Sequence, residues 1–351
     1  MSQIGTFLAK KDIQISAKRY GIDALSAMAQ GLFASLLMGT ILNTVGTLFA
    51  LPILVEIGSY ATAVKGPAMA AAIGMSLNAP NLVLFSLLAV GYAADALGGA
   101  GGPLAVYFIA IIACECGKLV FKETKVDILV TPFVTIFTGS VLAIAFAPTI
   151  GHGAIWLGNL IMWATDLQPF LMGILVSVLM GIFLTLPISS AAICAALSLT
   201  GLAGGAALAG CCTQMVGFAV ISFAINKWAG LVAQGIGTSM LQMGNIIKKP
   251  IIWLPTILAS AIIGPISTML FHLEMNGPAI SSGMGTCGLV GQIGVITGWL
   301  DETGSLALIP WMDWLGLLLV SFVLPAFITW VFHRGFLKAH LYTEEDLKLN
   351  L

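Results

Sequence analysis

Runs of about twenty apolar residues recur along this chain, and they constrain its fold more than any other feature. Such a run is the length of helix that crosses the hydrocarbon core of a bilayer. Eight runs can be drawn, at residues 24–42, 82–96, 104–120, 128–148, 170–186, 206–225, 251–271 and 314–332. Only 8% of the 351 residues are charged, against roughly 25% in an ordinary soluble domain. The sequence predicts an all-α polytopic membrane protein.

Four other apolar stretches are too broken by glycine and proline to be plain crossings, at 66–80, 187–205, 228–247 and 277–298. Three contain similar strings: GPAMAAAIG from Gly66, LPISSAAICAAL from Leu186 and GPAISSGMGTCGLVG from Gly277. Proline followed by small residues is typical of the interrupted, repeated segments with which transporters build a site. Close helix packing through small residues is the alternative. We expect eight to ten transmembrane helices, with re-entrant hairpins among the interrupted segments.

The third copy follows a histidine and a carboxylate, in the stretch FHLEMNGPAISSGMGTCGLV at 271–290. Non-helical backbone at membrane depth survives only where protein buries it or where it lines a watery cavity. His272 and Glu274 would point about 200° apart on a regular helix, so they converge only if the backbone breaks. Asn276-Gly277-Pro278 supplies that break. We therefore predict a chamber in which Glu274 and His272 hydrogen-bond a polyhydroxylated ligand; the alternative is that one of them lies in the aqueous interface.

Other polar residues are further candidates for binding substrate. Asn276 and Gly277 belong to the break itself, and Ser281 and Ser282 follow it. Ser189 and Ser190 occupy the matching place in the second copy, so the serines can supply hydroxyls on both sides of a pseudo-symmetric site. Serine hydroxyls that bond their own backbone are the alternative.

Ionisable residues inside apolar spans are functional candidates because they are costly in lipid. Asp95 and Glu115 are of this kind, although Asp95 alternatively caps a helix. Weaker candidates for lining the chamber are Gln214, Asn43 and Asn78.

Charge placement predicts the topology. Basic residues gather at 10–19, 118–125, 248–249 and 334–338, and the positive-inside rule then places both termini in the cytoplasm. We divide the chain into a cytoplasmic amphipathic segment at 1–23 that contacts membrane lipids, one transmembrane domain at 24–335, and a short cytoplasmic tail at 336–351. The net charge of −1 argues against nucleic acid as a partner.

Catalytic and cofactor motifs are missing from the sequence. It has no phosphate-binding loop and no dinucleotide fingerprint, so we expect no cofactor and no catalytic residue of its own. The six cysteines lie in apolar or glycine-rich segments. Buried thiols behave as small hydrophobes, so we expect packing roles for them rather than disulfides or a metal site.

Three strings carry a family resemblance: VDILVTPFVTIFTGSVLAIAFAP at 126–148, QGIGTSMLQMGNIIKKPIIWLPTILASAIIGP at 234–265 and NGPAISSGMG at 276–285. Together they resemble the type-2 IIC membrane subunit family of the bacterial phosphotransferase system, some of whose members are described as perfringolysin-regulator-like. The resemblance covers nearly the whole chain, and the GTSMLQ and KKPIIWLP strings make it specific.

The resemblance implies a permease of the bacterial inner membrane that binds a sugar and presents it for phosphorylation by a separate cytoplasmic IIB subunit, which IIA supplies. It also implies a homodimer, and a site in which a glutamate and a histidine near re-entrant hairpins contact the sugar; Glu274 and His272 are the nearest matches. Two alternatives stay open. One is a membrane sensor that keeps the permease fold without transport, and the other is an ion-coupled transporter of a small organic anion.

Overall fold

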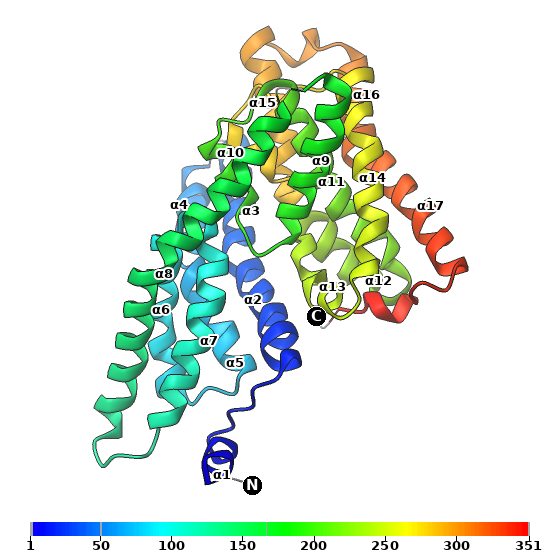
Figure 1. Cartoon of the computed structure of the whole chain (residues 1–351). Coiled ribbons are helices and arrows are strands. Elements are labelled where there is room, and N and C mark those ends of the chain that lie inside the picture. Colours follow the sequence, from blue (N-terminus) through cyan, green and yellow to red (C-terminus); the bar gives the residue numbers. More distant parts are fainter. Residues whose placement is uncertain (1–2, 50, 166, 350–351) are drawn as a thin grey trace. The chain divides into compact units, whose positions relative to one another are not determined.

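The computed structural model describes residues 3–49, 51–165 and 167–349, and the chain divides into two compact units, Met1–Gly153 and Ala154–Leu351 (Figure 1). The named elements are all helices; in the described ranges the β-structure consists of one isolated antiparallel bridge between Gly201 and Met275. The prediction of an all-α membrane protein is confirmed. The prediction of one transmembrane domain from 24 to 335 stays a prediction.

Six segments of the described residues are long and apolar enough to cross a membrane. They are Arg19–Thr47, Asn81–Val120, Asp127–Trp156, Gly201–Ile221, Pro250–Leu270 and Trp311–Lys338. The shorter helix Pro169–Thr185 is also apolar. The predicted spans 82–96 and 104–120 fall within one 40-residue segment, which a glycine turn divides into two helices.

The first unit is built from helices, of which α6, α7 and α8 are the longest. Its elements are α1 (Gln3–Lys10), η1 (Arg19–Asp23), α2 (Ala24–Leu32), η2 (Phe33–Leu37), α3 (Met38–Leu48), α4 (Pro52–Ala63), α5 (Lys65–Ser76), α6 (Asn81–Gly98), η3 (Gly99–Gly101), α7 (Gly102–Val120) and most of α8 (Asp127–Thr165). Gly99 has a φ of 50°, a conformation that glycine adopts without steric cost, and this turn lets α7 pack against α6.

Glycine also sets the spacing of α5 and α6. A Cβ atom at Gly91 would collide with the Gly66 carbonyl oxygen, and one at Gly66 would collide with the Gly91 carbonyl. The two backbones therefore touch, which is the close approach that small residues permit between membrane helices. For the first repeat copy, which begins at Gly66, the structure shows the helix packing that we considered as the alternative.

The second unit surrounds one buried helix, α11 (Gly201–Ile221), whose residues 204–219 are all buried. The other elements are α9 (Pro169–Thr185), α10 (Ser190–Ala196), α12 (Phe223–Val232), η4 (Ala233–Gly237), η5 (Ser239–Gln242), α13 (Met243–Lys248), η6 (Pro250–Trp253), α14 (Leu254–Pro265), η7 (Ile266–Leu270), η8 (Ala279–Gly283), η9 (Cys287–Leu289), α15 (Val290–Thr303), η10 (Leu306–Leu308), α16 (Trp311–Leu318), η11 (Leu319–Val323), α17 (Leu324–Lys338) and η12 (Glu344–Leu347).

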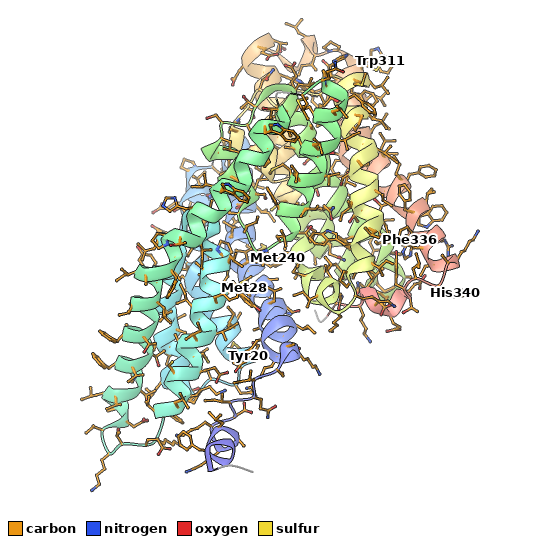
Figure 2. The ribbon with its side chains drawn as sticks, in the orientation of Figure 1. Tyr20, Met28, Met240, Trp311, Phe336 and His340 are labelled. Atoms are coloured by element: carbon orange, nitrogen blue, oxygen red, sulfur yellow. The ribbon has the colours of Figure 1, made fainter. Side chains whose placement is uncertain are left out.

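Helices α9, α11 and α14 pack in backbone contact at the centre of this unit. A Cβ atom at Gly210 would collide with the Ser177 carbonyl, and one at Gly264 would collide with the Gly173 carbonyl. Figure 2 shows Trp311, at the start of α16, and His340, just beyond α17, at opposite ends of the unit. Helices α16 and α17, joined by η11, therefore run along its length.

Helix α8 differs from the sequence-based expectation. We expected a crossing at residues 128–148, which ends at Pro148. The structure instead has one 39-residue helix with Pro132 and Pro148 inside it. Proline is tolerated inside a transmembrane helix because neighbouring groups and local adjustments of the helix satisfy the backbone groups that it frees, so such a helix continues.

Candidate functional site

The predicted backbone break at 271–278 is present. The chain leaves helical geometry after η7, and His272 has a φ of 45°. The amide of Met275 donates to the Gly201 carbonyl at 2.9 Å, and the amide of Gly201 donates back to the Met275 carbonyl at 2.9 Å. This bridge ties the extended stretch to the start of α11.

The extended stretch places its polar side chains on one side. Leu273 and Met275 are buried, whereas His272, Glu274 and Asn276 are exposed, as the two-residue period of extended backbone requires. The amide of Asn276 donates to Glu274 at 3.0 Å and to Glu302 at 2.6 Å. The break therefore brings His272 and Glu274 onto one face, and that face is turned outward from the second unit.

The segment that follows, 277–298, doubles back along α11. At its base the two arms touch through their backbones. A Cβ atom at Gly277 would collide with the Gly294 carbonyl, and one at Gly298 would collide with the backbone of Asn276 and Gly277. Its first arm reaches Met215 of α11, because the Thr286 hydroxyl lies 3.6 Å from the Met215 sulfur. The same arm begins beside Gly204 of α11, where a Cβ atom would meet Met275 and Ser282. Gly204 and Met215 are about 16 Å apart along the helix axis at 1.5 Å per residue.

The serines of the second and third repeat copies face each other, and their hydroxyls bond to backbone. The Ser190 hydroxyl donates to the Gly283 carbonyl at 2.7 Å, and the Ser282 hydroxyl donates to the Leu199 carbonyl at 2.7 Å. Ser189 accepts from the Ala192 amide at the start of α10. Helix α10 and η8 are therefore fastened together. Only Ser189 bonds the backbone of its own helix, as in the alternative that we considered, whereas Ser190 and Ser282 bond the backbone of another segment.

Asp95 lies at the end of α6, where Lys65 of α5 faces it. The Lys65 ammonium lies 3.4 Å from Asp95 Oδ2, while Oδ1 is buried and has no hydrogen-bond partner in the described part of the chain. This pairing belongs to the packing of two adjacent helices in the first unit.

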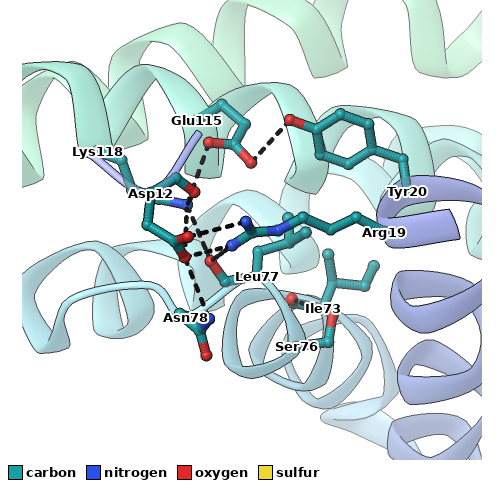
Figure 3. A network of polar contacts seen from close by, with 9 residues as sticks. All are labelled: Asp12, Arg19, Tyr20, Ile73, Ser76, Leu77, Asn78, Glu115 and Lys118. Atoms are coloured by element: carbon teal, nitrogen blue, oxygen red, sulfur yellow. Dashed lines mark hydrogen bonds and ion pairs between the residues drawn. The ribbon is translucent and has the colours of Figure 1, made fainter. Parts of the chain in front are cut away.

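Glu115 belongs to a network of charged groups that fastens the N-terminal segment (Figure 3). The Lys118 side chain is 2% exposed; it donates to the Asp12 carbonyl at 2.7 Å and the Leu77 carbonyl at 2.9 Å, and it lies 3.3 Å from Glu115 Oε2. The Tyr20 hydroxyl donates to Glu115 Oε1 at 3.0 Å. These contacts give Glu115 a structural partner on α7 and another on η1.

Arg19 and Asn78 complete the same network. Arg19 donates to both carboxylate oxygens of Asp12, at 3.1 and 2.6 Å, and to the Leu77 carbonyl at 2.7 Å. The Asn78 amide donates to Asp12 at 3.1 Å. The hydrogen bond from Arg19 is the main reason that the pKa of Asp12 is lowered to about 2, against the opposing effect of partial burial. The segment before η1 is thus tied to the ends of α5 and α7.

A buried polar cluster of the second unit surrounds Gln214, in the buried part of α11. Gln214 Oε1 accepts hydrogen bonds from the Trp253 indole at 2.9 Å and the Thr256 hydroxyl at 2.9 Å. The Thr185 and Ser239 hydroxyls lie 2.8 Å apart, and Thr185 is 3.4 Å from Gln214 Oε1. All five residues except Trp253 are fully buried. Among the residues that the structure describes, the buried Gln214 Nε2 finds no hydrogen-bond partner.

Elements next to interruptions of helical backbone supply this cluster. Helix α9 ends at Thr185, just before Pro187. Thr238 is extended just before Ser239 in η5, and Trp253 ends the short helix η6, which follows a non-helical residue, Lys249. The tip of the 277–298 segment reaches the same region, since Thr286 donates to the Gly235 carbonyl. An indole, an amide and several hydroxyls that converge in a buried place have the composition of a small-molecule site.

The sequence pointed to this cluster only in part. Gln214 was a weaker candidate, and Thr185, Ser239, Trp253 and Thr256 were missed. A signal was available, because Ser239 lies in the GTSMLQ string and Trp253 in the KKPIIWLP string.

Comparison with known families gives a match over almost the whole chain. The family model described as "Phosphotransferase system, EIIC" matches residues 22–349. Searches of curated proteins and of solved structures returned no match. The match agrees with the resemblance seen in the three sequence strings and with the six apolar segments. The chain belongs to the phosphotransferase system EIIC family, and it is therefore a multi-pass membrane permease component of a sugar phosphotransferase system.

Proposed function

We propose that this chain binds a sugar or polyol inside the membrane, at the cluster around Gln214, and releases it for phosphorylation by a separate cytoplasmic IIB subunit. The observation that carries the proposal is the buried Gln214 Nε2, for which no described residue supplies a hydrogen-bond partner. A buried polar group without a hydrogen bond costs about 1 to 3 kcal/mol. A ligand hydroxyl would accept from Nε2, and the Trp253 ring offers an apolar face for the sugar.

The interrupted segments supply the rest of this chamber in our proposal. We infer that residues 187–200 and 277–298 are re-entrant hairpins whose tips meet the ligand, as in transporters with sites at discontinuous helices. Ser190 and Ser282 hold the two hairpins together through their bonds to Gly283 and Leu199, with Gly277 at the base of the second. The exposed row of His272, Glu274 and Asn276 marks the approach to the chamber.

The topology follows from the same proposal. The six apolar segments become eight crossings when α6 and α7 are counted separately and α9 is added. The two hairpins raise the upper limit to ten transmembrane helices. Both termini lie in the cytoplasm of a bacterial cell, the chain spans the inner membrane as a homodimer, and α1 rests on the lipid surface. The phosphoryl group passes from IIA to IIB and then to the sugar, so the chain itself supplies binding and translocation.

The test measures sugar phosphate formed by inverted membrane vesicles that contain this chain, with purified IIA and IIB added. We expect sugar phosphate to form only when both soluble proteins and this chain are present. Binding of sugar with no transport or phosphorylation would be the behaviour of a sensor. Uptake that follows a proton or sodium gradient in cells without phosphotransferase enzymes would favour an ion-coupled transporter and would contradict the proposal.

A further inference from the structure

The C-terminal strap, residues 342–349, lies in a groove of the second unit that grips its main chain. Asn226 makes a pair of bonds, donating from Nδ2 to the Leu347 carbonyl at 2.8 Å and accepting from the Leu349 amide at 2.9 Å. Gln242 also donates to the Leu347 carbonyl, at 3.0 Å. Asn245 donates to the Lys348 carbonyl at 2.8 Å. The paired bonds of Asn226 imitate those that a neighbouring β-strand would make.

The gripping amides are held in place by the protein itself. Gln234 donates to the Ser222 hydroxyl at 2.8 Å and to the Gly230 carbonyl at 3.0 Å. Gln242 in turn donates to Gln234 at 2.9 Å, and Asn245 donates to Gln242 at 2.9 Å. Gln234 and Gln242 are fully buried. Groups held in this way are oriented for a main chain before it arrives, which lowers the entropy lost on binding.

Two leucines and one ion pair complete the fit. Leu347 is fully buried and Leu349 is 9% exposed, whereas Lys348 between them is exposed. Lys249 binds Asp346 at 2.8 Å. At the near end of the strap, the Tyr342 hydroxyl and His333 Nδ1 lie 2.7 Å apart in a buried contact. The groove therefore suits an extended segment with leucines two positions apart and an acidic residue before them.

The strap is linked to the proposed sugar site through a single turn. Gln242, which holds the strap, and Ser239, which contacts Thr185, are the last and first residues of the four-residue turn η5. Displacement of this turn would move both contacts together. Interfaces of this kind have discrete arrangements because packed elements do not deform continuously.

We propose that the C-terminal strap is a releasable latch that fixes η5, and with it the site around Gln214, when residues 343–349 occupy the groove. The groove is a binding site for an extended peptide, filled here by the chain's own end. Only the effect on the sugar site rests on the proposed function; binding of the strap in the groove does not.

The experiment uses a chain that ends at Tyr342 and a synthetic peptide with the sequence of residues 343–351. We expect the peptide to bind the shortened chain saturably, and the Leu347→Asp peptide to bind at least tenfold more weakly. The Lys348→Ala peptide is the control and should bind like the parent, because only the Lys348 carbonyl is gripped. Two results would overturn the claim that the groove binds this peptide. One is equal binding of a scrambled peptide, and the other is a lack of saturable binding to a shortened chain that still unfolds cooperatively.

The latch itself is tested by amide hydrogen exchange at residues 233–242, a readout that needs no sugar. We expect exchange in the shortened chain to rise at least fivefold and to return toward that of the full chain when the peptide is added. In the full chain, Asn226→Leu should raise exchange in the same residues. Peptide binding without any change in exchange at 239–242 would overturn the latch, whatever the outcome of sugar-binding assays.

Discussion

Replacement of Lys118 by methionine tests the buried charge network of the first unit. Methionine keeps most of the length of the side chain, so the change removes the charge and leaves little empty space. Lys118 is 2% exposed and Glu115 is 14% exposed. Glu115 and the carbonyls of Asp12 and Leu77 would lose their shared donor. Removal of one member of a buried ion pair costs about 3 to 5 kcal/mol, so we expect the free energy of unfolding to fall by about that amount.

The size of the effect is separable from general damage by a double-mutant cycle. With Glu115→Gln already present, Lys118→Met should cost less, because no uncompensated carboxylate is left behind. Lys125→Met is the control, since Lys125 is exposed and an exposed substitution changes stability by about 0.5 kcal/mol or less. Denaturant unfolding in micelles measures the free energy of unfolding of the parent, Lys118→Met, Glu115→Gln, the double variant and Lys125→Met. A loss below about 1 kcal/mol for Lys118→Met, or strictly additive effects, would refute the reasoning.

Two further predictions concern pH and helix packing. The pKa of Asp12 is lowered from 3.8 to about 2, so its stabilising contribution is complete above pH 4 and is lost as pH falls from about 4 to about 2. Protease protection of residues 11–18 should fall over that range and lose this dependence in Asp12→Asn; unchanged dependence would contradict the assignment. Gly210→Ala should lower the unfolding temperature sharply because its Cβ would collide with the Ser177 carbonyl, whereas Gly335→Ala, with open space around it, should be neutral or slightly stabilising; equal effects would be inconsistent with backbone contact between α9 and α11.

The helices of this fold follow from patterns that are local in the sequence. The apolar run at 206–225 predicted most of α11, because a buried membrane helix needs only length and apolarity. The break at 271–278 was also predictable, since Asn-Gly-Pro cannot continue a helix. The contacts made by the broken segment were not predictable, because the bridge between Met275 and Gly201 joins residues that are 74 positions apart.

The long-range polar contacts could not be read from the sequence. Glu115 was singled out as an ionisable residue in an apolar span. Its partner Lys118 also donates to the Asp12 carbonyl, which lies 106 residues away in the sequence. Thr185 and Ser239 lie in apolar surroundings that give no periodic signal, and tertiary folding alone brings them to Gln214. Pro148 predicted the end of a helix that instead continues to Thr165, because apolar surroundings tolerate an internal proline.

Equilibrium binding of a panel of radiolabelled sugars to the purified protein tests the central claim most directly. We expect at least one sugar to bind. Gln214→Leu, which removes the proposed donor to the ligand, should weaken binding, and so should Ser239→Ala, which removes the contact with Thr185 in the same cluster. Loss of a hydrogen bond to a buried ligand hydroxyl costs about 1 to 3 kcal/mol, or about 5- to 150-fold in affinity. Gln168→Leu, at an exposed position before α9, should bind like the parent. No binding across the panel, or unchanged affinity in both site variants, would contradict a sugar site at Gln214.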